Sequence, residues 1–375
     1  MKMCPVSKKC GGCAYLQMPY EEQLQMKKEQ VQKLFGKIPV GEIHGMEDPY
    51  HYRHKVYATF YRDRKEKMHA GIYEKNSHRL LDSSMCLIQD VKANQILQTI
   101  CHIADDMHIE PYDEDRNTGV LRHAYIRVSE AEGTVLLAIV IGSRFLPGSK
   151  NFVSRLREAH PEIETAVLNY NHARTSMILG PKEDILFGRG YITDRISGLQ
   201  FRISSKSFYQ VNPVQTEKLY ARAIGLARLK KTDTVLDMCC GIGTITLAAA
   251  GSCRQAVGVE INAEAIADAK VNAKINQMQN VSFYASDASE YMKRMKLHPD
   301  VIFFDPPRSG MSETALKAAG KAAPSRIVYV SCNPETQVRD IRILKSFGYR
   351  IQNLELFDLF PVTEHVETGC LLTHS

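Results

Sequence analysis

The sequence predicts an α/β protein whose carboxyl-terminal part folds as a doubly wound, mainly parallel sheet. From residue 231 onward, short apolar runs alternate with helical stretches, the pattern of repeated β-α-β units. Glycines follow the first apolar run, at Gly241 and Gly243, as in a tight turn from a strand into a helix. Acidic or thiol side chains follow the later runs, at the sheet edge where open α/β proteins bind ligands.

Each element of this region is justified by its apolar pattern and its flanking residues. The expected strands are 234–238, 256–260, 281–285, 301–304 and 327–331. The expected helices are 244–250, 263–275 and 313–321. Two further strands, near 351–357 and 369–373, would complete a seven-stranded sheet.

The rest of the chain has a different composition, which predicts three segments. Residues 1–47 hold clustered cysteines and a helix over 19–35 that Gly36 stops, and the loop of Cys86 is assigned to the same segment. Residues 48–203 contain β-branched and aromatic runs separated by Gly, Pro and Asn, which indicates a mainly β domain with one or two helices. Residues 204–375 are the α/β domain, with the boundary near 195–210.

Composition indicates an ordinary globular enzyme. The 375 residues carry a formal net charge of +6, which permits a polyanionic partner without requiring one. The longest apolar run, near 135–141, is far shorter than the roughly 20 residues of a membrane span, so we expect a cytoplasmic protein without a membrane partner. In that compartment the ten cysteines are expected to be ligands, nucleophiles or buried residues rather than disulfides.

A nucleoside cofactor is predicted by the turn from Asp237 to Gly243 and the acidic residues after the next two strands. Glu260 is placed to bind ribose hydroxyls, and Asp287 could meet an adenine edge. The turn lacks a full GxGxxG phosphate cradle, which favours S-adenosylmethionine over a dinucleotide. The alternative is a tight turn that binds nothing.

A thiol at the end of a strand is the candidate nucleophile of the chain. Cys332 follows the run 326–331, Asp305 and Arg308 follow the run before it, and Glu367 lies downstream beside His365. Their convergence would suit attack on an electron-poor ring. Taken singly, Cys332 could be a small buried residue and Glu367 a surface carboxylate.

Six motifs together resemble the RNA uracil-C5 methyltransferases. They are Cys4-x5-Cys10-Gly11-Gly12-Cys13 with Cys86, the stretch 207–212, the Asp237–Gly243 loop, Asp305-Pro306-Pro307-Arg308, Ser331-Cys332-Asn333-Pro334 and His365-Val366-Glu367. The resemblance implies a class I Rossmann-like methyltransferase domain that uses S-adenosylmethionine. It is closest to the short, iron-sulfur 23S ribosomal RNA form that modifies uridine 747, since the cysteine motif starts at Cys4 and leaves no room for an OB-like TRAM domain before it. Uridine 1939 of 23S RNA and uridine 54 of transfer RNA remain alternatives.

The resemblance also implies roles for individual residues. Cys332 would add to C6 of uracil and make C5 nucleophilic, and Glu367 would then remove the C5 proton, while His365 positions or packs. Arg308 would bind the uracil edge or the enolate oxygen, a duty that Asp305 could share. The expected cofactor contacts are Gln210, Asp237, Cys239, Gly241, Glu260, Asp287 and Asp305. Gln210 could instead cap a helix, and Cys239 stands where the family usually has an aromatic residue.

Cys4, Cys10, Cys13 and Cys86 form a candidate metal site. Four thiolates suit either tetrahedral zinc or a cubane iron-sulfur cluster, and spacing cannot separate the two. The resemblance favours a [4Fe–4S] cluster with a structural or RNA-positioning role.

Residues 50–79 interleave tyrosines with Arg and Lys, a composition that favours RNA contact through Arg62, Arg64, Lys65 and Lys67. A half-buried sheet with a solvated basic face would show the same pattern. The expected partner is 23S ribosomal RNA, without an obligatory protein partner. The competing functions are a base N-methyltransferase, which would need no thiol, and a noncatalytic RNA-binding assembly factor.

Overall fold

The computed structural model describes residues 3–374, and the chain divides into two compact units. Unit 1 comprises Met1–Leu16, Pro49–Asp194 and Ile203–Lys206. Unit 2 comprises Gln17–Asp48, Arg195–Arg202 and Ser207–Ser375. This division differs from the three segments expected from composition, because the helix of the cysteine-containing segment packs in unit 2 whereas its cysteines lie in unit 1.

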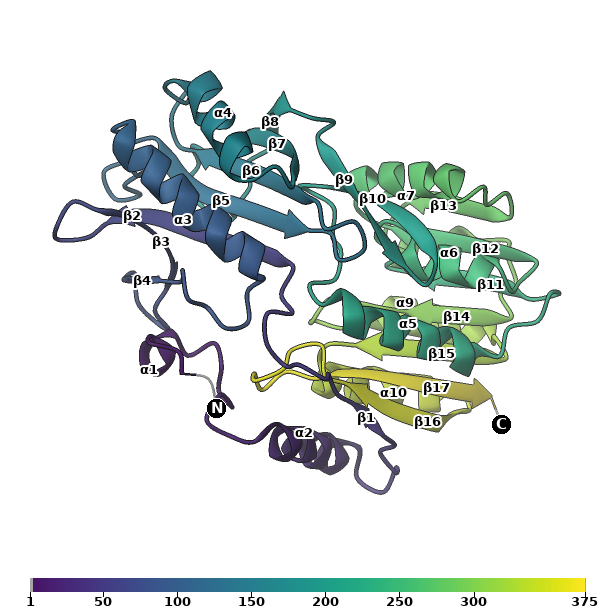
Figure 1. The fold of residues 1–375 in the computed structure, drawn as a ribbon. Helices are drawn as coiled ribbons and strands as arrows, with labels where there is room; N and C mark the ends of the chain where they lie inside the picture. The colour runs from purple at the N-terminus through teal and green to yellow at the C-terminus, as the bar shows by residue number, and fades with distance from the viewer. Residues whose placement is uncertain (1–2, 375) are drawn as a thin grey trace. The chain divides into compact units, whose positions relative to one another are not determined.

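Unit 2 is built on an eight-stranded sheet with the order β1-β16-β17-β15-β14-β11-β12-β13 (Figure 1). Strands β11, β12, β13, β14 and β15 are parallel, and β17 runs antiparallel to both β15 and β16. The strands are β1 (Ile43–His44), β11 (Thr234–Met238), β12 (Gln255–Glu260), β13 (Val281–Ala285), β14 (Val301–Phe304), β15 (Arg326–Ser331), β16 (Tyr349–Phe357) and β17 (Glu367–His374). All seven expected strands are confirmed.

The eighth strand comes from the amino-terminal region and was not predicted. Ile43 and His44 pair in parallel with Leu356 and Phe357. Gly41 permits this approach, because a Cβ there would lie 2.8 Å from the carbonyl oxygen of Leu354. Only a residue without a side chain lets the two backbones come so close.

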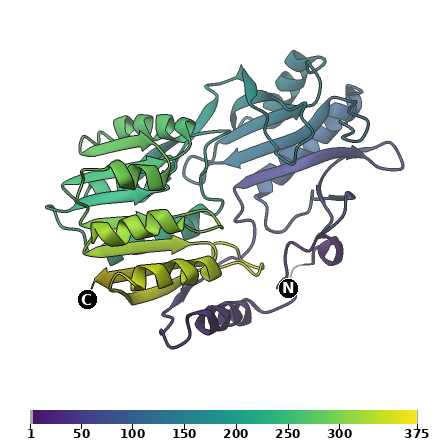
Figure 2. The same ribbon diagram turned by 180° about the vertical axis from the view of Figure 1, so that it is seen from behind.

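Helices cover both faces of this sheet. They are α2 (Tyr20–Phe35), α5 (Pro213–Ala227), α6 (Thr244–Ala250), α7 (Ala263–Ile275), α8 (Ala288–Arg294), α9 (Glu313–Ala322) and α10 (Pro334–Lys345). Helices α8, α9 and α10 lie side by side with α2 next to α10, and Figure 2 shows α9 and α10 in yellow-green across this face. Val31, Phe35, Leu316 and Ile341 pack from these helices onto the sheet.

Local sequence signals explain where these helices begin. Asn212 caps α5 by accepting a hydrogen bond from the Gln215 amide, and Asn333 caps α10 in the same way from Glu335. Each cap is followed by a proline, whose missing N–H costs nothing in the first turn. The expected helix over 19–35 is observed as Tyr20–Phe35, with Gly36 at its end.

Unit 1 contains a seven-stranded sheet with the order β4-β3-β2-β5-β6-β7-β8. All pairs are antiparallel except β6 with β7, which α4 connects. Its elements are α1 (Ser7–Cys10), β2 (Lys55–Arg62), β3 (Met68–Tyr73), β4 (Leu80–Asp82), α3 (Val91–Asp106), β5 (Leu121–Val128), β6 (Val135–Ile141), α4 (Ser149–Ala159), β7 (Ile163–Tyr170) and β8 (Lys182–Phe187). The expected mainly β region with one or two helices is therefore confirmed.

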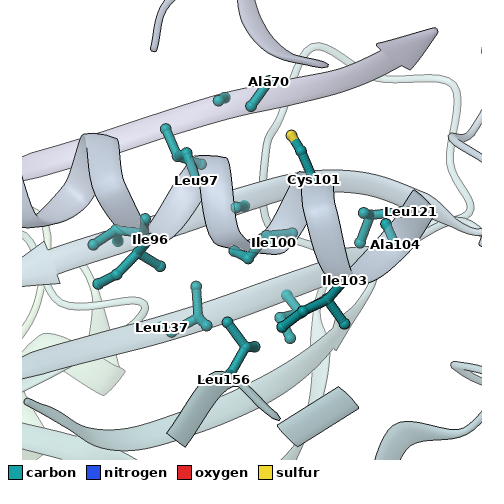
Figure 3. Close-up of a cluster of buried hydrophobic side chains, with 14 of the residues drawn as sticks. Ala70, Ile96, Leu97, Ile100, Cys101, Ile103, Ala104, Leu121, Leu137 and Leu156 are labelled. Atoms are coloured by element: carbon teal, nitrogen blue, oxygen red, sulfur yellow. The ribbon is translucent and has the colours of Figure 1, made fainter. Parts of the chain in front are cut away.

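Helices α3 and α4 lie side by side on one face of this sheet and bury a continuous apolar core. Figure 3 shows Leu97, Ile100 and Ile103 of α3 with Leu137 of β6 and Leu156 of α4 in this core. A separate two-stranded sheet of β9 (Tyr191–Ile196) and β10 (Leu199–Ser204) follows. Among residues 3–374, no helix is both long enough and apolar enough to cross a bilayer.

Candidate functional site

The strand order of unit 2 reverses between β11 and β14, and this point is where doubly wound sheets bind ligands. Asp237 is the penultimate residue of β11, and Asp305 directly follows β14. The pairing of Met238 with Phe304 brings these two carboxyl groups to the same edge. Burial, and then the charge of Asp237, raise the pKa of Asp305 to about 7.

Asp237 has the character of a ligand-binding carboxylate. Its side chain is fully buried, and Oδ2 accepts a hydrogen bond of 2.6 Å from Thr246 Oγ1. Oδ1 is buried without a hydrogen-bond partner. Burial raises the pKa of Asp237 to about 7, and the Glu260 carboxylate adds to the effect. A buried acceptor without a donor is costly, so this atom is suited to an ammonium or hydroxyl group of a ligand.

The turn after β11 is open above Gly241. Gly241 has a φ of +54°, and no heavy atom lies within 4 Å of the position of an added Cβ. Its amide donates to Glu260 Oε2 at 3.2 Å, while Glu260 Oε1 accepts from the Asn262 amide at 2.9 Å. The Glu260 carboxylate at the end of β12 is thereby held beside the glycine turn, where a nucleoside would approach the backbone.

Cys239 lies in this turn with a φ of +68°, a conformation that is uncommon outside glycine. Its Sγ lies 3.9 Å from Met311 Sδ. Burial raises the pKa of its thiol to about 12, and the nearby carboxylates of Glu260 and Asp305 contribute. The residue is therefore a neutral, packed thiol next to the carboxylates.

The remaining expected cofactor residues have different surroundings. The side chain of Gln210 hydrogen-bonds to the buried Tyr220, so it does not cap α5, a role that Asn212 fills. Asp287 is exposed and caps α8, with Oδ1 accepting from the amides of Ser289 and Glu290. A capping function alone accounts for Asp287 in this structure.

Cys332 and Glu367 are brought together by the register of two antiparallel strands. Ser331 of β15 pairs with Thr368 of β17 in antiparallel orientation. Cys332, which follows Ser331, therefore lies opposite Glu367, which precedes Thr368. Burial and then the charges of Glu367 and Asp305 raise the pKa of the Cys332 thiol to about 12, whereas Arg308 lowers it. Glu367 is 3% exposed, and burial raises its pKa well above the usual value.

The loop of Arg308 is tied to the loop of Cys332. The side-chain amide of Asn333 donates to the Arg308 carbonyl oxygen at 3.1 Å, and Thr336 Oγ1 donates to the same oxygen at 3.3 Å. The positive charge of Arg308 favours the ionised forms of both Cys332 and Glu367. The Cys332 thiol, the Glu367 carboxyl and the Arg308 guanidinium therefore lie near one another and near Asp305. His365 packs edge-on against Phe360.

In unit 1, the four cysteines of the candidate metal site surround one cavity of about 30 Å³. Cys4, Cys10, Cys13 and Cys86 all line it, and burial followed by the other three thiols raises the pKa of Cys13 to about 12. Burial also raises the pKa of Cys86, which the amides of Ile88 and Gln89 oppose. Within residues 3–374, no three His, Cys, Asp or Glu side chains are arranged to hold a single metal ion.

The predicted basic stretch is only partly available to a ligand. Arg62 is held by Asp105 at 2.8 Å and by Glu110 at 3.1 Å, so its charge is already neutralised within unit 1. Arg64, Lys65 and Lys67 are exposed in the turn between β2 and β3. Tyr52 and Phe60 are buried, so these two rings of the interleaved pattern belong to the core.

The sequence analysis did not identify two groups that support the site. Thr246 orients Asp237, and its place on the first turn of the helix after the glycine turn is a signal that could have indicated this contact. Lys27 of α2 binds Asp358 with both side chains fully buried. Its four-residue spacing from the core residue Val31 is the signal that could have placed it on the inner face of the helix.

Comparisons with known proteins found similar chains over nearly the whole sequence. The family model described as tRNA (Uracil-5-)-methyltransferase matches residues 19–375. An uncharacterized RNA methyltransferase of Halalkalibacterium halodurans is 39% identical and is matched over 98% of this chain and 82% of its own length. A second uncharacterized RNA methyltransferase, from Oceanobacillus iheyensis, is 41% identical over 97% of this chain and 81% of its length.

A solved structure has the same fold. The tRNA (uracil-54, C5)-methyltransferase of Pyrococcus abyssi, in complex with S-adenosyl-L-homocysteine, superimposes with a TM-score of 0.83 at 24% identity. The match covers 100% of this chain and 88% of that one. It shows that the fold is shared over the length of this chain.

Proposed function

Because the chain belongs to the tRNA (uracil-5-)-methyltransferase family, we propose that it methylates C5 of a uridine in RNA, with S-adenosylmethionine as donor. The observation that carries the proposal is the pairing of Ser331 with Thr368, which sets the Cys332 thiol opposite the Glu367 carboxyl beside Asp305 and Arg308. A nucleophile, a base and a cation at one sheet edge suit chemistry on an electron-poor ring.

The residues around the glycine turn fit the proposed donor. S-adenosylmethionine, when bound, supplies an electrophilic methyl group on a sulfonium. The unpaired Oδ1 of Asp237 would accept from its ammonium group, Gly241 would allow close approach of the backbone, and Glu260 would bind ribose hydroxyls. Gln210, Cys239 and Asp305 would complete the cofactor contacts. Asp287 is proposed to meet the adenine edge while its Oδ1 caps α8.

The proposed mechanism uses Cys332 first as a nucleophile. Once the thiol proton has passed to solvent water, the sulfur forms a bond to C6 of uracil, and the electrons of the C5–C6 double bond move toward C5 and O4. C5 would then take the methyl group from the sulfonium, whose S–CH3 bond breaks to leave a neutral thioether. Arg308 would stabilise the negative charge on the ring oxygen. Glu367 then removes the C5 proton, and the S–C6 bond breaks with its electron pair returning to sulfur. The raised pKa of Glu367 makes it a stronger base once it is ionised.

We propose 23S ribosomal RNA, at uridine 747, as the target, with uridine 1939 of the same RNA and uridine 54 of transfer RNA as alternatives. The cysteine motif with Cys86, together with the other five motifs, resembles the 23S RNA enzymes that carry an iron-sulfur cluster. Arg64, Lys65 and Lys67 are exposed and could bind phosphates, and Arg62 would have to leave its carboxylate partners to do so.

The four cysteines of unit 1 are proposed to hold a [4Fe–4S] cluster, with zinc as the alternative. Four soft thiol donors around a single cavity suit either group. The resemblance of the cysteine motif to the iron-sulfur enzymes favours the cluster over zinc. Anaerobically purified protein should contain about four irons per chain. Stoichiometric zinc without visible absorbance would contradict the proposal.

The decisive experiment traps the covalent intermediate. Purified protein is mixed with S-adenosylmethionine and a 23S RNA fragment in which 5-fluorouridine replaces uridine, since fluorine stands where the base must remove a proton. A denaturation-resistant adduct should form in the wild type and in the control Cys253→Ala, whose thiol is buried in the turn between α6 and β12. It should be absent in Cys332→Ala.

The outcomes separate the competing functions. An adduct on transfer RNA but not on 23S RNA would support the proposed uracil-C5 methylation and show that the substrate is transfer RNA. Methylation that survives Cys332→Ala would indicate a base N-methyltransferase. Absence of both adduct and S-adenosylmethionine binding would leave a noncatalytic RNA-binding protein.

A further inference from the structure

Two loops of unit 1 lie side by side at one edge of its sheet. Strands β6 and β7 are parallel, with Ile141 paired to Tyr170, so the loops over 142–148 and 171–181 leave the sheet together. His172 Nδ1 and the Gly142 carbonyl oxygen are 2.8 Å apart, which joins the two loops. Leu146 of the first loop is buried in the core formed with α3 and α4.

Buried polar side chains hydrogen-bond to the backbone of the second loop, residues 171–181. Arg122 is 2% exposed and donates to the carbonyl oxygens of Asn171 at 2.7 Å and Ala173 at 2.9 Å. Asn171 is also buried, and its side-chain amide donates to the Met177 carbonyl oxygen at 2.7 Å. Burying an arginine to bind the backbone of a surface loop fixes the shape of that loop before any partner arrives.

The outer side of these loops is both basic and apolar. Phe145 is 67% exposed and Met177 is 66% exposed. Arg144, Lys150 and Arg174 are exposed as well, and residues 142–150 and 171–182 include no Asp or Glu. We call Arg144, Phe145, Lys150, Arg174 and Met177 the loop surface.

Among residues 3–374, the basic side chains of the loop surface are not neutralised by carboxylates. Elsewhere in unit 1, Arg62, Arg155 and Arg189 pair with carboxylates. In the part of the chain from residue 3 to residue 374, Arg144, Lys150 and Arg174 form no ion pair. Three exposed cations and an exposed aromatic ring on these two joined loops and the start of α4 are complementary to a single-stranded polyanion that carries flat bases.

We propose that the loop surface binds an unpaired segment of RNA, with phosphates on Arg144 and Arg174 and a base stacked on Phe145. The proposal rests on the proposed function, because it assigns a second contact region to the RNA that the enzyme modifies. It replaces Arg62 as the main expected arginine contact of unit 1. Stacking is tolerant of sequence, so this region would supply affinity rather than choice of uridine.

The test measures binding of a fluorescein-labelled oligouridine of about 12 nucleotides to the full chain by fluorescence anisotropy. Phe145→Ala should weaken binding by about 5- to 150-fold, the range expected for loss of one stacked base. The double variant Arg144→Ala/Arg174→Ala should lower the slope of log affinity against log salt by about 0.7 for each phosphate that the protein no longer neutralises.

Matched controls change exposed residues of unit 1 outside the loop surface. Ile185 is 57% exposed on β8, and the side chain of Arg116 is 82% exposed. Ile185→Ala and Arg116→Ala should each leave oligouridine affinity within about twofold of the wild type, because truncating a residue outside the binding surface changes affinity little. All variants concern exposed side chains, and unchanged far-ultraviolet circular dichroism confirms that they fold.

The outcome is separable from that of the adduct experiment. If the 5-fluorouridine adduct forms but the loop-surface variants bind oligouridine with unchanged affinity and salt slope, the RNA assignment of this surface is wrong and a protein partner becomes the alternative. If no adduct forms on any RNA while these variants bind oligouridine more weakly, the loop surface stands and the proposed methylation is wrong.

Discussion

Removing one partner of the buried ion pair between Lys27 and Asp358 should strongly destabilise unit 2. Both side chains are 0% exposed, and Lys27 Nζ lies 2.6 Å from Asp358 Oδ1. Lys27 also donates to the Phe360 carbonyl oxygen at 3.1 Å, and Tyr20 donates to Asp358 Oδ2 at 2.8 Å. The pair thus ties α2 to the loop that leads into Glu367.

Lys27→Met removes one charge and leaves the other buried. Asp358 would keep only the Tyr20 hydroxyl as a side-chain donor, which cannot compensate for a desolvated carboxylate. Breaking a fully buried pair in this way costs about 3–5 kcal/mol in the free energy of unfolding. The double variant Lys27→Met/Asp358→Leu should regain most of that loss, because no charge remains uncompensated.

Urea unfolding followed by far-ultraviolet circular dichroism measures these differences, since the chain has no tryptophan to report by fluorescence. Lys33→Met is the matched control, because Lys33 is exposed on the same helix and its removal should change stability by less than about 0.5 kcal/mol. A Lys27→Met variant within about 1 kcal/mol of the wild type, or a double variant no more stable than the single, would refute the reasoning.

Three further predictions concern the site in unit 2. Burial raises the pKa of Asp237 and of Asp305 to about 7 in the folded protein. Between about pH 4 and pH 7 the folded protein therefore holds protons that the unfolded chain has released. Without ligand, the free energy of unfolding should fall as the pH rises through this range. Asp237→Asn should reduce this slope in a series of thermal denaturations, and an unchanged slope would show that burial does not perturb this carboxyl. Gly243→Ala should destabilise unit 2 by more than the roughly 1–2 kcal/mol expected from its positive φ, because the new Cβ would lie 2.9 Å from the Phe283 ring. Gly241→Ala should lower the free energy of unfolding by about 1–2 kcal/mol from its positive φ alone, and its main effect should be weaker S-adenosylmethionine binding, measured by calorimetry. If urea unfolding shows Gly241→Ala to be less stable than Gly243→Ala, the packing argument is wrong. Asn333→Asp keeps the cap of α10 but loses the amide that donates to the Arg308 carbonyl oxygen, so adduct formation should slow while stability changes by less than about 1 kcal/mol. Equal rates for this variant and the wild type would show that the hydrogen bond does not position Arg308.

Much of the α/β unit could be predicted because its signals are local. Each of the seven expected strands is an apolar run bounded by turn residues. Asn212 and Asn333, each followed by a proline, are local signals for the starts of α5 and α10. Parallel strands with helical crossovers place their carboxyl ends at one edge, so the sequence predicts that Asp237 and Asp305 lie at the same edge. The direct pairing of β11 with β14 is known only from the structure. Local pattern was sufficient wherever the chain's own sequence order determined the neighbours.

Pairings between distant segments could not be predicted in the same way. Strand β1 joins β16 across more than three hundred residues, and a two-residue strand has too little periodicity to be recognised. Arg62 was predicted to bind RNA because its neighbours in sequence are basic, yet its neighbours in space are Asp105 and Glu110. Whether a charge is free to bind a ligand depends on the tertiary structure and not on composition.

By itself, the sequence determined which chemical groups this protein has and at which strand ends they lie: a thiol at Cys332, a carboxyl at Glu367 and a glycine turn at Gly241. Only the tertiary structure decided that β17 turns back antiparallel to β15, which sets that thiol and that carboxyl opposite each other. It also decided which charges are neutralised inside the fold and which, such as Arg144 and Arg174, face solvent. The physical reason is that periodicity encodes neighbours along the chain, whereas register, burial and ion pairing are set by contacts between segments far apart in sequence.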